Sequence, residues 1–283
     1  MTYGVEVITF GVMISEKNRI KFTLSYDGTD FCGWQRQSID RENSAKEKPS
    51  LNRTVVSALE KIFKHSIELS ASGRTDAGVH AINQVAHFDT TMTVEQLKRL
   101  NLSRAVRSFL PPTIVIKKTW IAPSEFHSTL SAEKKTYRYL IYNSPLPSAF
   151  FQRTMGYVRE PLDIDFLNEC SKIILGEHDF KSFQSVGTDV TSTIRTIYKA
   201  NWRLLRPNVA EFSITGSGFL KQMVRNIVGT QLLLQRKKLK SHKMAAIIES
   251  CDRRQAGPPA DPQGLYLMKV YYPLDLDNKC LEL

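Results

Sequence analysis

Alternation of polar and apolar side chains with period two predicts several half-buried β-strands along the chain. The first covers residues 19–26 (RIKFTLSY) and is followed by Asp27-Gly28, a dipeptide typical of turns. The other predicted strands lie at residues 66–71, 83–89, 135–142, 195–205, 208–215 and 265–272.

Apolar residues at helical spacing predict helices between these strands. From residue 51 to residue 63 one face carries Val55, Ala58, Leu59 and Ile62. Three more helices are expected, at residues 94–109 (ended by Pro111-Pro112), 163–175 and 219–235. In the last of these, one face is an apolar stripe, and Lys221 and Arg225 share another face at a spacing of four residues.

Strands and helices interleave in both halves of the sequence, which predicts an α+β protein of two similar α/β lobes with a cleft between them. We place the boundary near residue 120. The expected organisation is an N-terminal extension at residues 1–18, a first lobe at 19–120 and a second lobe at 121–283. The polar segment 36–50 predicts an exposed loop.

The net charge narrows the choice of partners. Lys and Arg total 39 against 28 Asp and Glu, a formal charge of +11 that points to nucleic acid or an anionic membrane surface. A role in solubility is the alternative, and charge alone does not separate them. No apolar run approaches the roughly 20 residues that span a bilayer, and residues 7–14 lack the flanks of a signal peptide. We therefore expect no membrane partner and a cytoplasmic protein.

Cysteine and histidine spacing gives no sign of a metal site. The four cysteines are widely separated and form no C-x-x-C pair, and no histidine has metal-ligand spacing to a cysteine or carboxylate. The sequence therefore predicts free structural thiols, no zinc site and no disulfide framework. The cysteines are Cys32, Cys170, Cys251 and Cys280.

The segment SGRTDAGVHA, residues 72–81, carries the chemistry of greatest interest. Gly73 and Gly78 bracket Asp76, so the backbone can turn sharply and a substrate can approach the carboxylate closely. The guanidinium of Arg74, two residues away, would keep that carboxylate ionised or bind phosphate. The alternative is a structural turn, since Asp and Gly are common turn residues.

The run GRTDAGVHA resembles the signature loop of the TruA family of tRNA pseudouridine synthases, and this resemblance implies that Asp76 is the essential catalytic residue. Nine contiguous residues make the motif highly specific, and the likeness extends over nearly the whole chain after residue 19. Further stretches similar to the family are YDGTDFCGWQRQ (26–37), KKTYRYLIYN (134–143), GEHDFKSF (176–183), GSGFLKQMVRNIVG (216–229) and AGPPADPQGLYLMKVYYP (256–273).

The resemblance assigns three more residues to the active site. Tyr137 corresponds to the family's active-site tyrosine, although Tyr139 shares its face of the strand and a core aromatic is the simpler interpretation. Arg225 would pair with Asp76 and orient it. Without the family match, the simpler interpretation of Arg225 is a solvated cation on an amphipathic helix. Leu265 would form part of an apolar wall for uracil.

Other residues in these stretches remain open. Trp34 and Arg36 could contact RNA, although a tryptophan beside a glycine turn is as readily a core residue. Lys134, Lys135 and Arg138 suit a phosphate track or, equally, a solvated face. His178 is interpreted as structural.

By resemblance, the fold is a pseudouridine synthase fold with mainly antiparallel sheets around a basic cleft. The implied reaction isomerises uridine to pseudouridine at positions 38–40 of the tRNA anticodon arm, by a homodimer and without a cofactor. Asp76 would attack C1′ or C6 of the extruded uridine, or remove the C2′ proton with help from Tyr137. The sequence does not choose between these routes.

Two other functions are possible. One is a non-catalytic RNA-binding protein of the same architecture; the other is a glycosidic hydrolase that pairs Asp76 with Asp89. The chain also departs from the family: Ser128-Thr129 stands where Ala-Arg is common, and the loop from residue 38 to residue 49 is longer than usual. The first twelve residues have no recognised counterpart, so Met13 could be the true start.

Overall fold

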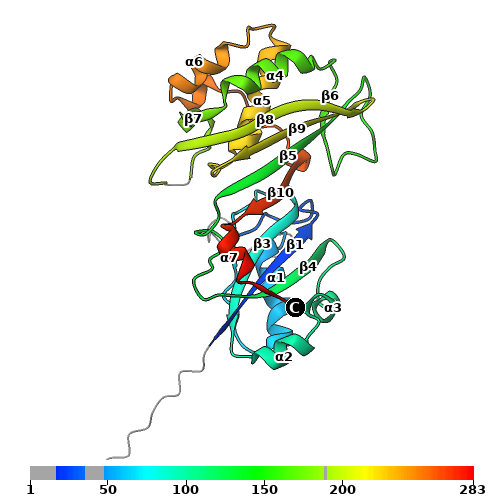
Figure 1. Cartoon of the computed structure of the whole chain (residues 1–283). Coiled ribbons are helices and arrows are strands. Elements are labelled where there is room, and N and C mark those ends of the chain that lie inside the picture. Colours follow the sequence, from blue (N-terminus) through cyan, green and yellow to red (C-terminus); the bar gives the residue numbers. More distant parts are fainter. Residues whose placement is uncertain (1–16, 36–47, 188–189) are drawn as a thin grey trace, which may run out of the picture.

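The computed structural model describes residues 17–35, 48–187 and 190–283. Eleven strands of this described part form one sheet (Figure 1). They are β1 (Asn18–Tyr26), β2 (Ser70–Ala71), β3 (His80–Thr90), β4 (Ile114–Ala122), β5 (Lys134–Asn143), β6 (Gly156–Val158), β7 (Gly176–Asp179), β8 (Ile194–Arg206), β9 (Val209–Gly216), β10 (Leu265–Tyr271) and β11 (Leu281–Glu282).

The strand order across the sheet is β11-β4-β1-β3-β10-β5-β9-β8-β7, with β2 attached to β3 and β6 attached to β5. Neighbours are antiparallel except for two pairs, β10 with β3 and β5 with β6. The expected α+β fold with a mainly antiparallel sheet is therefore confirmed.

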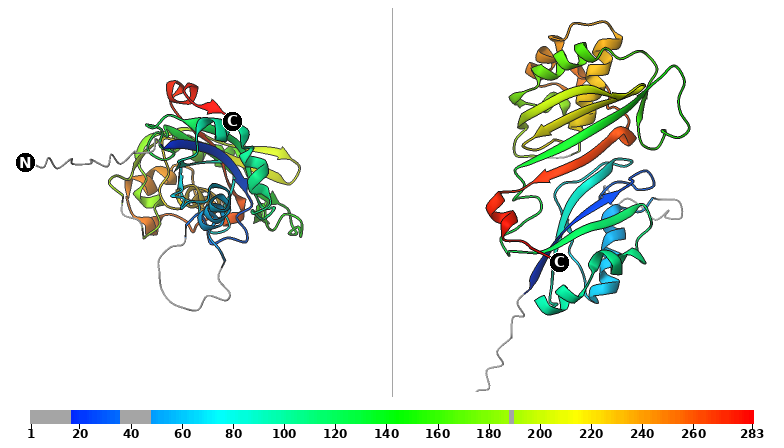
Figure 2. Two further views of the ribbon diagram at one scale, coloured as in Figure 1. Left: turned by 90° about the horizontal axis from the view of Figure 1, so that it is seen from below. Right: turned by 45° about the vertical axis from the view of Figure 1, so that its right-hand side comes forward.

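Helices cover one face of each half of the sheet (Figures 1 and 2). The N-terminal strands carry the first three helices and the C-terminal strands carry the next three, while α7 follows β10. The helices are α1 (Leu51–Phe63), α2 (Val94–Arg99), α3 (Leu102–Arg107), α4 (Ile164–Ile173), α5 (Met223–Arg236), α6 (Lys243–Glu249) and α7 (Leu274–Asn278). Among the described helices, none is long and apolar enough to cross a membrane.

Strand β10 joins the two halves. Tyr266 pairs with His80 of β3 on one side, and Leu265 pairs with Tyr139 of β5 on the other. The chain then returns to the N-terminal half, where β11 pairs with β4. Because one sheet runs through both halves, the boundary near residue 120 and the lobes at 19–120 and 121–283 stay predictions.

Most predicted elements are present. The helix at residues 51–63 is α1, whose first turn is capped by Ser50, and β1, β3, β5, β8, β9 and β10 lie at the predicted positions. The strand predicted at 66–71 is reduced to Ser70–Ala71. One physical reason is that the Ile67 amide donates to the Glu60 carboxylate rather than to a neighbouring strand. The predicted loop 36–50 and extension 1–18 fall mostly outside the described residues.

Two helix predictions were wrong in detail. The segment 94–109 forms two short helices, because Leu100 is extended and the Asn101 side chain caps a new helix by accepting from the Arg104 amide. The helix predicted from residue 219 begins only at Met223, since Gln222 has a left-handed backbone (φ 58°). Lys221 therefore lies outside the helix and does not share a helical face with Arg225.

Candidate active site

Asp76 lies on the loop between β2 and β3, and three groups of contacts fix this loop. The Ser72 hydroxyl donates to the Gln84 side-chain oxygen (2.6 Å), and the Gln84 amide donates to the Gly73 carbonyl (2.9 Å). At the other end, the Trp34 amide donates to the Thr75 carbonyl (2.9 Å). The loop is thus held from β3 and from the segment at residues 26–35, and Asp76 projects from a fixed backbone.

Gly33 allows the segment at residues 26–35 to come this close. Its φ is +106°, and an added Cβ would lie 2.6 Å from the Thr75 carbonyl oxygen. A side chain at this position is therefore excluded by both conformation and space. Trp34 beside it is 2% exposed and belongs to the core, so of the two interpretations of this tryptophan the structure supports packing. Arg36 lies outside the described residues.

Arg225, in the first turn of α5, faces Asp76. Its Nη1 lies 3.2 Å from the Asp76 Oδ2, and the two side chains are 10% and 22% exposed, respectively. Arg225 Nε donates to the Ala260 carbonyl (2.7 Å), and the Ala260 amide donates to the Arg225 carbonyl (3.0 Å). Residues from three distant parts of the sequence therefore place one cation against one carboxylate in a sheltered position.

Tyr137 of β5 is buried and lines the same cleft. Its ring packs edge-to-face on Phe219, with ring centroids 5.1 Å apart. Burial, and then the nearby Tyr26 and Asp76, raise the pKa of the Tyr137 phenol well above its ordinary value. The phenol is therefore neutral at physiological pH and keeps a proton that it can donate beside Asp76.

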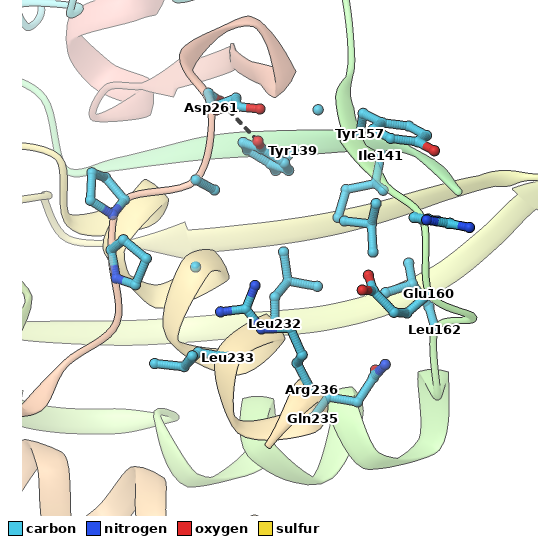
Figure 3. A pocket seen from close by; sticks show the side chains of 17 residues that line it. Tyr139, Ile141, Tyr157, Glu160, Leu162, Leu232, Leu233, Gln235, Arg236 and Asp261 are labelled. Atoms are coloured by element: carbon cyan, nitrogen blue, oxygen red, sulfur yellow. Dashed lines mark hydrogen bonds between the residues drawn. The ribbon is translucent and has the colours of Figure 1, made fainter. Parts of the chain in front are cut away.

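Tyr139, the other tyrosine on this face of β5, points to a different place. Its hydroxyl donates to the Asp261 carbonyl (2.8 Å), as the dashed line in Figure 3 shows. This bond ties the segment 257–264, which also carries Ala260, to β5. The site around it is a second pocket of about 370 Å³ between β6, the end of α5 and Pro258–Pro259. The geometry thus separates the two tyrosines: Tyr137 faces the cleft of Asp76 and Tyr139 supports its wall.

The cleft has a volume of about 1840 Å³, ample for a nucleotide, and both halves of the sheet contribute to it. Asp76 is the only carboxylate among the described residues that line it, and Leu265, 6% exposed, belongs to its apolar part. The cations along the cleft are Lys48, Arg74, Lys221 and Arg225. An acid beside an apolar surface within a basic cleft suits a neutral base carried on a polyanion.

Arg74 does not act on Asp76 as expected. It is exposed, lines the cleft and, within the described chain, forms no ion pair or hydrogen bond with Asp76, whose cationic partner is Arg225. Asp89 is also elsewhere, in a two-pronged ion pair with Arg19 at the end of β3 (2.7 and 2.8 Å). His178 Nε2 donates to the Leu175 carbonyl (2.8 Å), which fits a structural role.

Sequence reasoning missed some of the cleft. Lys48, Asn52 and Phe219 line it, yet only Phe219 lies in a motif that had been singled out. The Ser128-Thr129 departure also has a local function. The Ser128 hydroxyl donates to the Ser70 carbonyl (2.9 Å) and the Thr129 hydroxyl to the Ala71 carbonyl (2.6 Å), so this pair supports the strand that leads into the Asp76 loop.

Comparisons with known proteins agree on one family. Residues 171–273 match a family model described as tRNA pseudouridine synthase. A protein of Bdellovibrio bacteriovorus named tRNA pseudouridine synthase A is 58% identical over 265 residues, which cover 94% of this chain and 99% of that protein. Proteins of the same name from Geobacillus sp. (41% identity; 90% of this chain, 98% of that one) and Ruminiclostridium cellulolyticum (38%; 90% and 99%) match as extensively. With likeness of this degree along nine-tenths of its length, the chain belongs to the tRNA pseudouridine synthase A (TruA) family.

Proposed function

We propose that this protein isomerises uridine to pseudouridine in tRNA, with Asp76 as its catalytic carboxylate. The observation that carries the proposal is the pairing of Asp76 with Arg225, 3.2 Å apart, in a cleft where the described lining residues include no second carboxylate. The family membership supports the reaction class, and the basic lining supports an RNA substrate.

The reaction breaks the C1′–N1 bond of uridine and forms a C1′–C5 bond, while one proton leaves C5 and one is gained at N1. No group is transferred and no electron is lost, so the side chains present are chemically sufficient. Asp76 attacks C1′ or C6, or removes the C2′ proton; Arg225 pairs with the carboxylate and orients it. The neutral phenol of Tyr137 stacks on the extruded base or moves a proton beside it. Leu265 and Phe219 supply the apolar surface for uracil.

The finer specificity follows the family resemblance. We expect the target uridines at positions 38–40 of the anticodon arm, a homodimer in which one tRNA contacts both subunits, and a cytoplasmic location. Arg74, exposed on the cleft, is the candidate for a phosphate contact. Pseudouridine mapping in tRNA from cells lacking the protein tests the positions, and light scattering of the purified protein tests the dimer.

The Asp76→Asn variant tests the core of the proposal. Incubation of tRNA labelled with tritium at uridine C5 releases tritium to water whenever C5 becomes bonded to C1′. The wild type should release it, and Asp76→Asn should not, while both bind tRNA with nearly equal affinity because only the reacting oxygen is replaced.

Controls separate the competing functions. A non-catalytic RNA-binding protein would protect the tRNA without releasing tritium in either form. A hydrolase would liberate free uracil and leave an abasic site. Sustained turnover by Asp76→Asn would show that another group carries the reaction.

A further inference from the structure

Strand alternation divides the three cations of β5 that the sequence left unresolved. Lys134 and Arg138 lie on one face, where Lys134 Nζ sits over the Tyr271 ring (4.9 Å) and Arg138 approaches Glu211 (3.9 Å). Lys135 lies on the other face, which it shares with Tyr137 of the cleft. Only Lys135 therefore projects toward the site of Asp76.

Lys135 reaches the base of the catalytic loop. Its Nζ donates to the Ser72 carbonyl (2.6 Å), and an added Cβ on Gly73 would lie 3.4 Å from it. The next residue, Arg74, lines the cleft. An ammonium group has three N–H donors, so this one contact leaves donors for a ligand at the mouth of the loop.

Arg195 of β8 stands beside Lys135. Arg195 lies on the same face of β8 as Ile197. Ile197 pairs with Gly216 of β9, and Gly216 pairs on its other side with Lys135 of β5. An added Cβ on Gly218 would lie 3.5 Å from the Arg195 Nε, and Phe219, next in sequence, lines the cleft. Lys135 therefore lies behind the Asp76 loop and Arg195 behind the 216–219 turn, and each is next to a segment that lines the cleft.

These two cations have no anionic partner within the described part of the chain. The Arg195 guanidinium donates to the carbonyls of Ser192 (2.9 Å) and Ile194 (2.6 Å), and Lys135 to that of Ser72. Burial and the neighbouring Arg195 lower the pKa of Lys135 to about 8, and burial lowers the pKa of Arg195. Two like charges held together and partly desolvated are unfavourable unless an anion neutralises them.

We propose that Lys135 and Arg195 together bind one phosphate group of the RNA backbone next to the target uridine. Gly73 and Gly218 have no side chain to cover the two cations, since an added Cβ would already touch the Lys135 Nζ or the Arg195 Nε, and a phosphate oxygen can accept from both cations at once. A phosphate held here would anchor the backbone of the extruded nucleotide while its base enters the pocket formed with Tyr137 and Leu265. The identity of the RNA in this assignment rests on the proposed function. The binding of a phosphate by Lys135 and Arg195 does not.

The test measures binding and turnover separately. Lys135→Gln and Arg195→Gln are each made in the wild type for turnover and in the Asp76→Asn background for binding. The ligand is a synthetic anticodon stem-loop RNA, titrated at several salt concentrations. Lys279→Gln is the control, since it also removes one positive charge but from an exposed lysine that contacts Glu125 of the N-terminal half.

We expect Lys135→Gln and Arg195→Gln each to weaken binding about tenfold, because a charge-assisted hydrogen bond to phosphate is lost. The slope of log affinity against log salt should decrease by about 0.7 to 0.9, the loss of about one phosphate contact. A stem-loop carrying a neutral methylphosphonate at the contacted position should bind the wild type as weakly as it binds the two variants. Lys279→Gln should change neither quantity.

If Lys135 and Arg195 only support the loop, their variants would lower stability or kcat. The slope of log affinity against log salt and the response to each methylphosphonate would stay those of the parent protein, and that result overturns the inference. Failure of the proposed function looks different. The wild type would then form no pseudouridine in any RNA, while the loss of salt slope in the two variants would still establish the phosphate site.

Discussion

Replacing Gly33 with alanine tests whether the loop of Asp76 is positioned by the segment at residues 26–35. The new Cβ would lie 2.6 Å from the Thr75 carbonyl oxygen, whereas contacts of this kind are tolerated at 3.0–3.4 Å, so the loop must move by 0.4 to 0.8 Å. Misplacement of reacting groups by about 1 Å can reduce rates by about 100-fold. We therefore expect Gly33→Ala to lower kcat by roughly 10- to 100-fold.

The substitution also carries a cost of backbone strain, because φ at Gly33 is +106°. A side chain in such a conformation costs on the order of 1–3 kcal/mol of stability. Gly176→Ala separates the two effects. Its φ is +92°, but the nearest atom to an added Cβ is 4.0 Å away, and it lies on the edge strand β7 outside the residues that line the cleft.

Single-turnover conversion of tRNA and urea unfolding measure the two quantities for both variants. Both should lose the stability that the backbone strain costs, Gly33→Ala should lose more because of its close contact, and only Gly33→Ala should lose turnover. The reasoning is refuted if folded Gly33→Ala converts tRNA at the wild-type rate, or if Gly176→Ala loses as much turnover as Gly33→Ala.

Three other perturbations have defined outcomes. Arg225→Gln removes the cation that lies 3.2 Å from Asp76 and should lower kcat by about 100-fold with little change in KM, measured by steady-state tritium release; an unchanged kcat would contradict its orienting role. Tyr139→Phe leaves the Asp261 carbonyl without its donor and should lower the free energy of unfolding by about 1–2 kcal/mol in urea titrations, whereas unchanged stability would show that the bond contributes nothing. Burial lowers the pKa of His87 from 6.5 to about 4, so the unfolded chain takes up a proton at this residue at a higher pH than the folded protein does. The free energy of unfolding should therefore fall as the pH drops from about 6.5 to about 4, by at most about 3 kcal/mol. His87→Asn should lack that part of the pH dependence in urea titrations.

Elements that are stabilised by interactions within a short segment could be predicted from the sequence, whereas elements that depend on other interactions could not. Helix α1 was predicted to the residue because its apolar spacing and its Ser50 cap lie within the segment itself. The break between α2 and α3 depends on the Asn101 cap competing with an otherwise continuous helical pattern. Strand β4 (Ile114–Ala122) was not predicted, although it pairs with β1 along its length.

The residues of the site were predicted from the resemblance to family motifs, because the spacing of residue types alone did not identify them. Asp76, Tyr137, Arg225 and Leu265 were named before the structure, and all four line one cleft. Their meeting depends on contacts over long sequence separations, such as that between Arg225 and Ala260, which no local pattern encodes. Arg74, by contrast, was assigned to Asp76 from proximity in sequence alone, and the loop directs it to the surface instead.

The central position of β10 has a consequence for synthesis of the protein on the ribosome. Residues 265–271 are translated after both β3 and β5, yet they fill the gap between these two strands. Until they emerge, a nascent chain carries two unpaired strand edges, which readily associate with other chains. Emergence of β10, rather than growth of either half, is thus the step that closes the sheet. A stop codon shortly before residue 265 should give an aggregating product in which Asp76 and Tyr137 never come together.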